Sequence, residues 1–596
     1  MSWRSTNRNS SPNERPTLFN AAQLRSRLCA LSRTFWPTKG LASVFDFAVS
    51  SNRRAVFMLV TASLIAFLPG VFPIPPIDRD EPHFAQKAKQ MIETGDYVDT
   101  RFQGEAHYTK PVGMYWLQAA MVKTAEAFGV PDARTTIWLY RLPSLFGAAG
   151  AVLATYWCAL AFVDRRGAAL AALMMVGSTL LGAEARLARA DTMLLFTVVT
   201  AMSVLARAYL FSRDDKIARP GWALLTVFWT ALAAGILVKG LVIVMIVGLT
   251  AATLSIIDRS VRWLQELRPL YGVVWLVVLA LPWFIAIYAR TGNAFLLDSV
   301  VHDTLGKIAN SQESHGAPPG YYVVLFFATF FPASVLAGSA APAVWAKRRE
   351  APIRFLLAWL VPSWLVFELS VTKLPHYVMP LYPAIAILIA GAVEAKVLSR
   401  RRWLKRVVIW WFVAPILLSI TAVAGAIVID RDLVLPAWPF FAAAIVCGFL
   451  AWQLYNDDGA ERALTRATAA MVLMNIGVYS MILPTLGPLF PSVALAGVLR
   501  ESGCTHPVAA SAGYGEPSLV FLAGTETRLT DASGAADFLR EGACRFAFIE
   551  THQERAFAQR AESIGLRYER GPRVEAFNFS KGQPITIAIF RSGGEP

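Results

Sequence analysis

The run GVVWLVVLALPWFIAIYA, residues 272–289, carries no charged side chain and is nearly long enough to cross a bilayer as an α-helix. Comparable apolar runs recur along most of the 596 residues. Hydrophobic residues make up 55% of the chain and charged residues 16%, whereas roughly a quarter of a soluble domain is charged. The sequence therefore predicts a polytopic α-helical membrane protein. It argues against a soluble enzyme and excludes a disordered chain, collagen and a small disulfide-rich protein.

The length criterion predicts about thirteen membrane spans. The first, residues 55–75, is expected to be an uncleaved signal anchor, because no apolar core precedes it. The others are expected at residues 137–163, 168–187, 191–211, 221–238, 240–257, 272–289, 321–345, 355–371, 377–395, 407–429, 434–455 and 467–490. Residues 1–54 form a basic segment. Its sequence is compatible either with a helix lying on the membrane surface or with a disordered tail.

The formal net charge of +15 could indicate nucleic-acid binding, but the basic residues gather in alternate connections between spans. These connections contain Arg165 and Arg166; Arg213, Lys216 and Arg219; Arg259, Arg262 and Arg268; Lys347, Arg348, Arg349 and Arg354; Lys396, Arg400, Arg401, Arg402, Lys405 and Arg406; and Arg462 and Arg466. The positive-inside rule assigns them to the cytoplasm. We therefore expect a bacterial inner-membrane protein, in contact with membrane lipids and not with nucleic acid, whose loops 77–136 and 290–320 face the periplasm.

Residues 491–596 have the composition of a soluble domain and are expected on the periplasmic side of the membrane domain, residues 55–490. The pattern predicts a small α/β domain with strands at 508–511, 518–522, 545–549 and 585–590 and helices at 535–540 and 553–564. Cys504 and Cys544 both fall in this domain. In an oxidising compartment they could form a disulfide, or they could remain too far apart to bridge.

The expected outer loops are short but dense in ionisable and aromatic residues. A single such residue most often only faces water. Glu184, Lys239 and Lys373, however, lie at the ends of apolar runs. A charge placed there costs a few kcal/mol of free energy unless it is paired or lines a cavity. If these loops converge, they form one pocket with carboxylates, cations and aromatic walls. The cations could bind a lipid phosphate and a carboxylate could serve as a base, a pattern typical of sugar transfer from a lipid-phosphate carrier.

Several segments resemble one family of enzymes in their order along the chain. They are Asp80-Glu81-Pro82-His83-Phe84-Ala85, Tyr108-Thr109-Lys110-Pro111, Glu184-Ala185-Arg186-Leu187-Ala188-Arg189-Ala190-Asp191, Val238-Lys239-Gly240 and Lys373-Leu374-Pro375-His376-Tyr377. Together they are similar to the C-type membrane glycosyltransferases (GT-C fold), in the branch that contains lipid A aminoarabinose transferases and protein O-mannosyltransferases.

The resemblance implies an inverting transferase that takes a sugar from a polyprenyl-phosphate carrier and transfers it to lipid A or to another glycan or protein acceptor. By position, Asp80 corresponds to the catalytic carboxylate, and Asp191 to a second acidic residue beside the cavity. Lys110 would hold the donor phosphate with Arg189 and Tyr377. Further substrate-binding candidates are Glu81, Tyr108, His302 and Lys373.

The chain departs from the family pattern at three positions, where His83 replaces an arginine, Thr109 a glutamate and Val112 a proline. A metal site that uses this glutamate with the histidine matched by His302 would lack its carboxylate. No cofactor is therefore assigned, and a divalent metal stays open. The donor sugar also stays open between aminoarabinose and a neutral or acidic sugar.

Two other functions fit a polytopic chain: a transporter or flippase of lipid-linked sugars, and a noncatalytic scaffold. A transporter typically has related halves and a site near mid-membrane. The sequence has no convincing internal repeat, and its ionisable residues concentrate on one side. This distribution favours chemistry at the membrane surface.

Overall fold

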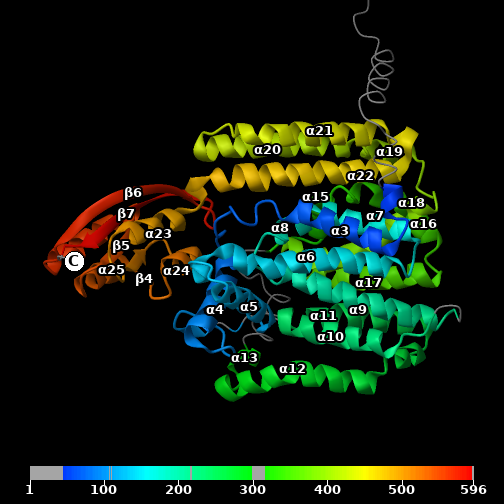
Figure 1. Ribbon diagram of the computed structural model, residues 1–596, viewed down its shortest axis with the longest axis horizontal. Coiled ribbons are helices and arrows are strands. Elements are labelled where there is room, and N and C mark those ends of the chain that lie inside the picture. The colour runs from blue at the N-terminus through cyan, green and yellow to red at the C-terminus, as the bar shows by residue number, and fades with distance from the viewer. Residues whose placement is uncertain (1–44, 107, 109, 215–217, 298–315, 594–596) are drawn as a thin grey trace, which may run out of the picture. The chain divides into compact units, whose positions relative to one another are not determined.

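Helices dominate the part of the chain that the computed structural model describes, residues 45–106, 108, 110–214, 218–297 and 316–593. The predicted surface helix near the N-terminus, Thr109 and His302 lie outside the described residues. Internal contacts divide the chain into two units, Met1–Ala55 and Val56–Pro596. The second unit contains the helices and the sheet discussed below (Figure 1).

Within the described residues, nine helical segments are long and apolar enough to cross a membrane. They are α6 (Ile137–Ala159), α9 (Asp191–Phe211), α10 (Trp222–Lys239), α12 (Pro269–Thr291), α17 (Ala351–Leu369), α18 (Tyr382–Glu394) with the turn η4 (Pro375–Leu381), α20 (Trp410–Asp430) with α19 (Arg402–Val407), α21 (Trp438–Gln453) with η5 (Leu435–Ala437), and α22 (Tyr455–Ile476) with its π-helical continuation η6 (Gly477–Ile482). The predicted polytopic membrane fold is confirmed.

The remaining predicted spans coincide with shorter or broken helices. The structure has α3 (Asn52–Phe67), α7 (Arg165–Gly177) followed by α8 (Thr179–Glu184), and α11 (Val242–Asp258). The apolar run predicted as a span at 321–345 forms a bent pair of helices instead of one continuous helix. Here α15 (Tyr321–Thr329) and α16 (Ser334–Ala346) meet at 119°, and Pro332, which cannot donate a backbone hydrogen bond, lies in the break between them.

The last predicted span, 467–490, begins too late. Helix α22 already starts at Tyr455, so Arg462 and Arg466 lie on a helix instead of in a connection. Arg466 pairs with Asp458 at 2.5 Å across a kink at Gly459, and this ion pair offsets part of the cost of placing both charges there. The hydropathy pattern did not predict this polar first part of the helix, because a charged stretch is typical of a loop when its ion pairs are not known.

Small residues let α6 and α9 approach closely, and this contact fixes the start of α9 near the site. A Cβ atom added to Gly147 on α6 would lie 2.8 Å from the backbone nitrogen of Met193. Glycine permits such backbone contacts between membrane helices. The polar start of α9, at Asp191, is thereby held against α6.

The C-terminal region forms a five-stranded sheet in the order β4-β3-β5-β7-β6. Its strands are β3 (Val508–Ala512), β4 (Arg528–Thr530), β5 (Arg545–Glu550), β6 (Tyr568–Asn578) and β7 (Gln583–Ser592). β3 pairs in parallel with β4 and β5, whereas β7 pairs antiparallel with β5 and β6. The helices are α23 (Pro491–Glu501), α24 (Pro517–Ala523), α25 (Ala532–Arg540) and α26 (Glu554–Ser563).

One predicted strand of this region, 518–522, is wrong because these residues form helix α24. Pro517 starts the helix, and a short buried apolar run has no periodicity that separates helix from strand. Strands β4 and β6 were not predicted, since both expose mostly polar side chains. Cys504 and Cys544 form a disulfide, which resolves the alternative that the sequence left open.

Helix α4 (Asp80–Thr94), which follows α3 along the chain, packs against α24 and against α5 (Gly113–Ala127) (Figure 1). The ammonium of Lys89 on α4 donates to the carbonyl oxygen of Phe521 at 2.9 Å. The ring of Phe521 lies edge-on to Tyr140 of α6. Contacts on α4 therefore join the sheet region to the membrane helices.

Candidate active site

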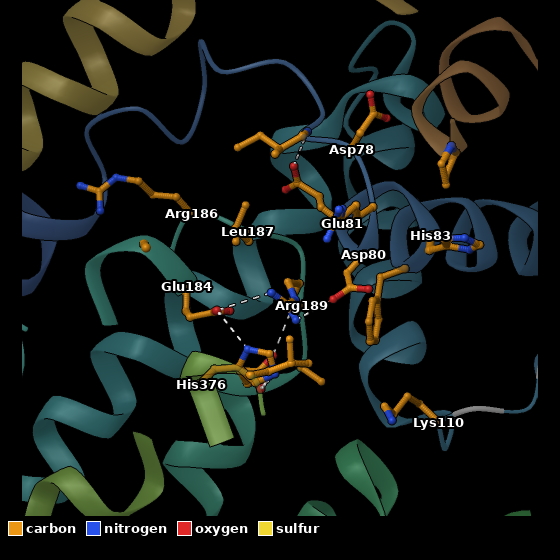
Figure 2. Close-up of a pocket in the computed structure, with 18 of the residues that line it drawn as sticks. Asp78, Asp80, Glu81, His83, Lys110, Glu184, Arg186, Leu187, Arg189 and His376 are labelled. Atoms are coloured by element: carbon orange, nitrogen blue, oxygen red, sulfur yellow. Dashed lines mark hydrogen bonds and ion pairs between the residues drawn. The ribbon is translucent and has the colours of Figure 1, made fainter. Parts of the chain in front are cut away.

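Segments far apart in the sequence surround one cavity of about 1050 Å³ (Figure 2). Its walls come from the segment between α3 and α4, from α4, from the turn between α8 and α9, from η4, and from the C-terminal region. Among the residues proposed from the sequence, those that line the cavity are Asp80, Glu81, Tyr108, Lys110, Arg189, Asp191 and Tyr377. The loops that carry these residues thus meet in one place.

Asp80 is the first residue of α4, and 55% of its side-chain surface is exposed. Its carboxylate lies 2.7 Å from the guanidinium of Arg189, which belongs to the turn before α9. The preceding residue, Arg79, has φ 83° and ψ −116°, a conformation that residues with a Cβ atom rarely adopt. Such backbone strain often accompanies functional positions.

Arg189 is the centre of a buried charge cluster (Figure 2). Its guanidinium lies 3.5 Å from Glu184 and 3.7 Å from Asp191. Lys239, the last residue of α10, donates a hydrogen bond to Asp191. The imidazole of His376 lies 3.6 Å from Glu184 and 3.5 Å from Asp191. Each buried carboxylate therefore has cationic neighbours, which such burial requires.

Glu81 lines the same cavity but is only 2% exposed in its side chain. It forms an ion pair of 2.8 Å with Arg141 of α6 and accepts hydrogen bonds from the backbone nitrogens of Ile77 and Ala188, both at 2.9 Å. Since these partners come from three segments, Glu81 connects the first outer loop to α6 and to the turn that carries Arg189.

Lys373, proposed from the sequence as a substrate-binding residue, is not among the described residues that line the cavity. Its ammonium donates to the carbonyl oxygens of Ser370 and Ala317 at 2.6 and 2.8 Å. Ser370 follows directly on α17, and a lysine satisfies carbonyl groups at a helix C-terminus. In the structure, Lys373 therefore contacts backbone carbonyl groups, which is a structural role.

Sequence reasoning left several lining residues without a role. Glu184, Lys239 and His376 could be recognised in the sequence as polar residues at the ends of apolar runs. The pattern did not predict that they belong to one cluster. Tyr479 gave no local signal, because it lies in the π-helical turn η6. The residues from the C-terminal region were also missed, and these are Glu516, Pro517, Phe579 and Ser580.

Glu184, Asp191 and His376 offer metal-ligand atoms that lie within 4.8 Å of one another. Carboxylate and imidazole groups are suitable ligands for a divalent cation. However, Arg189 approaches both carboxylates and Lys239 donates to Asp191. These protein cations occupy the place where a metal charge would be needed, so the cluster does not fit a resident metal.

A family model described as "Dolichyl-phosphate-mannose-protein mannosyltransferase" (PMT) matches residues 77–297. Among curated proteins, the undecaprenyl phosphate-alpha-4-amino-4-deoxy-L-arabinose arabinosyl transferase of Pseudomonas aeruginosa strain UCBPP-PA14 is 31% identical over 356 residues, 57% of this chain and 60% of the relative. The corresponding protein of Pectobacterium carotovorum is 25% identical over 384 residues, 63% of this chain and 66% of the relative. The matches span about three fifths of the relatives' length.

The fold is similar to that of ArnT from Cupriavidus metallidurans. The crystal structure of ArnT bound to undecaprenyl phosphate has a TM-score of 0.69 and 17% identity, and the match covers 90% of this chain and 98% of that chain. The apo structure gives a TM-score of 0.70 and the same identity, with coverage of 89% and 97%. The resemblance recognised in the sequence is thus confirmed: the chain is similar in sequence to the aminoarabinose transferases and similar in fold to ArnT.

Proposed function

We propose that this chain transfers a sugar from a polyprenyl-phosphate carrier to a lipid A-type acceptor. The observation that carries the proposal is the contact of the exposed Asp80 carboxylate with Arg189, in a cavity that Lys110 also lines. One exposed carboxylate and several cations are what a displacement at the anomeric carbon of a phosphate-linked sugar needs. The names of the curated relatives and the ligand of the similar crystal structure support this donor class.

In the proposed reaction, Lys110 binds the phosphate of the donor together with Tyr377, which also lines the cavity. The acceptor oxygen attacks the anomeric carbon from the opposite face, the bond to the phosphate oxygen breaks, and the configuration is inverted. The cations stabilise the negative charge that the leaving phosphate gains. Asp80 takes the proton of a hydroxyl acceptor, or orients an acceptor phosphate that is already ionised.

Three further residues have supporting roles in this proposal. Arg189 orients Asp80 through their 2.7 Å contact. Asp191 and Lys239 form the wall beside Arg189 and keep its guanidinium in place. Glu81, whose carboxylate is occupied by Arg141 and two backbone nitrogens, positions the start of α4 instead of touching the substrate.

The cavity is proposed to face the periplasm. The distribution of lysine and arginine between alternate connections supports this orientation, because basic connections stay in the cytoplasm. The Cys504–Cys544 disulfide in the C-terminal region agrees with it, since disulfides persist in oxidising compartments.

Mass spectrometry of lipid A and other envelope glycoconjugates tests the proposal. Cells with the gene should carry one pentose-sized or hexose-sized addition that cells without it lack, and the mass identifies the sugar. A gene carrying Asp80→Asn should not restore the addition, although the protein is present in the membrane. No change in any glycan would contradict the proposal, and movement of an intact lipid-linked sugar between leaflets would favour a flippase.

A further inference from the structure

The outer wall of the cavity belongs to the C-terminal region. Phe579 and Ser580 line it from the turn between β6 and β7, and Glu516 and Pro517 line it from the start of α24. In Figure 2, Asp80 lies between Asp78 on one side and Lys110 on the other, and the C-terminal region approaches on the side of Asp78. The two sides of Asp80 therefore have different walls.

Direct hydrogen bonds fix this outer wall to the residues before Asp80. Asp78 accepts from the hydroxyl of Tyr514 and from the backbone nitrogen of Ser518, both at 3.3 Å. The guanidinium of Arg79 donates to the carbonyl oxygen of Ser580 at 2.6 Å. Because Asp78, Arg79 and Asp80 are consecutive, the turn is held one residue away from the proposed catalytic carboxylate.

The turn between β6 and β7 is held in one shape by Glu516. Its carboxylate accepts from the side chains of Asn578 at 3.1 Å and Ser580 at 2.9 Å. Phe579, between these two residues, leaves 54% of its surface exposed and lines the cavity. The fold thus presents an aromatic ring to the cavity instead of burying it in the sheet.

Arg79 adds a charge beside this ring. Its side chain is exposed and lines the cavity, and in the described part of the chain its guanidinium has one hydrogen-bond acceptor, the carbonyl oxygen of Ser580. A guanidinium has five N–H donors, so most of them are available to a ligand. Arg79 also has the rare backbone conformation described above, which is typical of functional positions.

We propose that Arg79 and Phe579 form the acceptor subsite, and that this subsite binds a sugar that carries a phosphate group. An aromatic ring offers a flat apolar face to a sugar ring, and a guanidinium binds phosphate through paired hydrogen bonds. This inference rests on the proposed function. If Lys110 holds the leaving phosphate, an inverting attack comes from the opposite face of the anomeric carbon. The wall with Arg79 and Phe579 contacts Asp78, on the side of Asp80 away from Lys110, so an acceptor bound there would lie beside Asp80 and away from the leaving phosphate.

Binding measurements on the full-length protein in detergent test the subsite with three probes: lipid A, lipid A whose phosphates have been removed by phosphatase, and undecaprenyl phosphate. Arg79→Ala should weaken binding of lipid A by about tenfold, the size of a lost charge-assisted contact. It should leave the dephosphorylated lipid unaffected. Phe579→Ala should weaken binding of both lipid A forms, and Phe579→Tyr should restore it.

The control is Lys581→Ala, a change in the same turn at an exposed residue outside the described lining of the cavity. It should alter no affinity, and none of these variants should change undecaprenyl phosphate binding by more than about twofold. Unchanged lipid A binding in Arg79→Ala and Phe579→Ala would overturn the subsite and leave the proposed function intact. If wild-type protein binds undecaprenyl phosphate but not lipid A, this result excludes a lipid A-type acceptor in both the proposed function and the proposed subsite.

Discussion

Arg141 of α6 and Glu81 of α4 form an ion pair of 2.8 Å whose side chains are 0% and 2% exposed. The same guanidinium also donates to the carbonyl oxygens of Val71, Ile74 and Pro75, in the segment that leads to α4. The pair thus ties the start of α4 to a membrane helix. This arrangement keeps Asp80, the residue immediately before Glu81, facing Arg189.

Removal of Arg141 should therefore destabilise the protein strongly. Arg141→Met leaves Glu81 buried without its cation, which typically costs about 3–5 kcal/mol. Thermal unfolding of the detergent-solubilised protein measures the effect. The control is Arg134→Met, which breaks the more exposed pair with Glu126 and should cost less than about 1 kcal/mol. Equal unfolding temperatures for the two variants would refute the structural role of the buried pair.

Two lysines that the sequence analysis proposed as substrate-binding residues, Lys110 and Lys373, should behave differently. Lys110→Ala should weaken undecaprenyl phosphate binding by about tenfold, because it removes a cation from the cavity wall. Lys373→Ala should leave this affinity within about twofold and instead lower the unfolding temperature, because Ser370 and Ala317 lose their donor. Calorimetric titration and thermal unfolding of both variants measure the two effects. A loss of donor binding in Lys373→Ala as large as in Lys110→Ala would contradict this assignment.

The contact between Asp78 and α24 should make stability depend on pH. Burial raises the pKa of the Asp78 carboxyl to about 7, and the nearby Glu516 adds to the rise. The folded state then binds a proton that the unfolded state has already released. The free energy of unfolding should therefore fall as pH rises from about 4 to about 7 and level off above.

Thermal unfolding across this pH range, compared between wild type and Asp78→Asn, measures that slope. The asparagine cannot ionise, so the variant should lose this contribution and gain stability relative to wild type at pH 8. Asp132→Asn, at an exposed position, is the control and should keep the wild-type slope. A slope that survives in Asp78→Asn would assign the pH dependence to another group.

Much of the membrane fold could be predicted because span length, apolar composition and the placement of arginine and lysine act locally. The failures have physical causes. The bend between α15 and α16 lies at Pro332, inside one apolar run, and Arg466 of α22 pairs with Asp458, eight residues earlier. Residues 518–521 are buried, so their pattern fits a strand as well as a helix.

The site was predictable only where residues resemble a known pattern. Asp80, Lys110, Arg189 and Asp191 were found this way, and the structure places all four on one cavity. Phe579 and Glu516 could not be found, since their role depends on how the C-terminal region docks on α4. The different environments of Lys110 and Lys373 could not be predicted either, because the sequence does not show which lysine contacts backbone carbonyl groups.

The most direct test of the central claim is the turnover of purified Asp80→Asn with undecaprenyl-phosphate-linked sugar and lipid A, beside wild type and Asp132→Asn. For a hydroxyl acceptor, we expect the kcat of Asp80→Asn to fall by about 10²–10⁴, the usual contribution of a general base. For an acceptor phosphate that is already ionised, the fall is smaller, because Asp80 then only orients the acceptor. Undecaprenyl phosphate binding and the unfolding temperature should be retained in both cases. Asp132→Asn should match wild type. A folded Asp80→Asn protein with wild-type turnover would contradict the claim that the reaction takes place at this carboxylate.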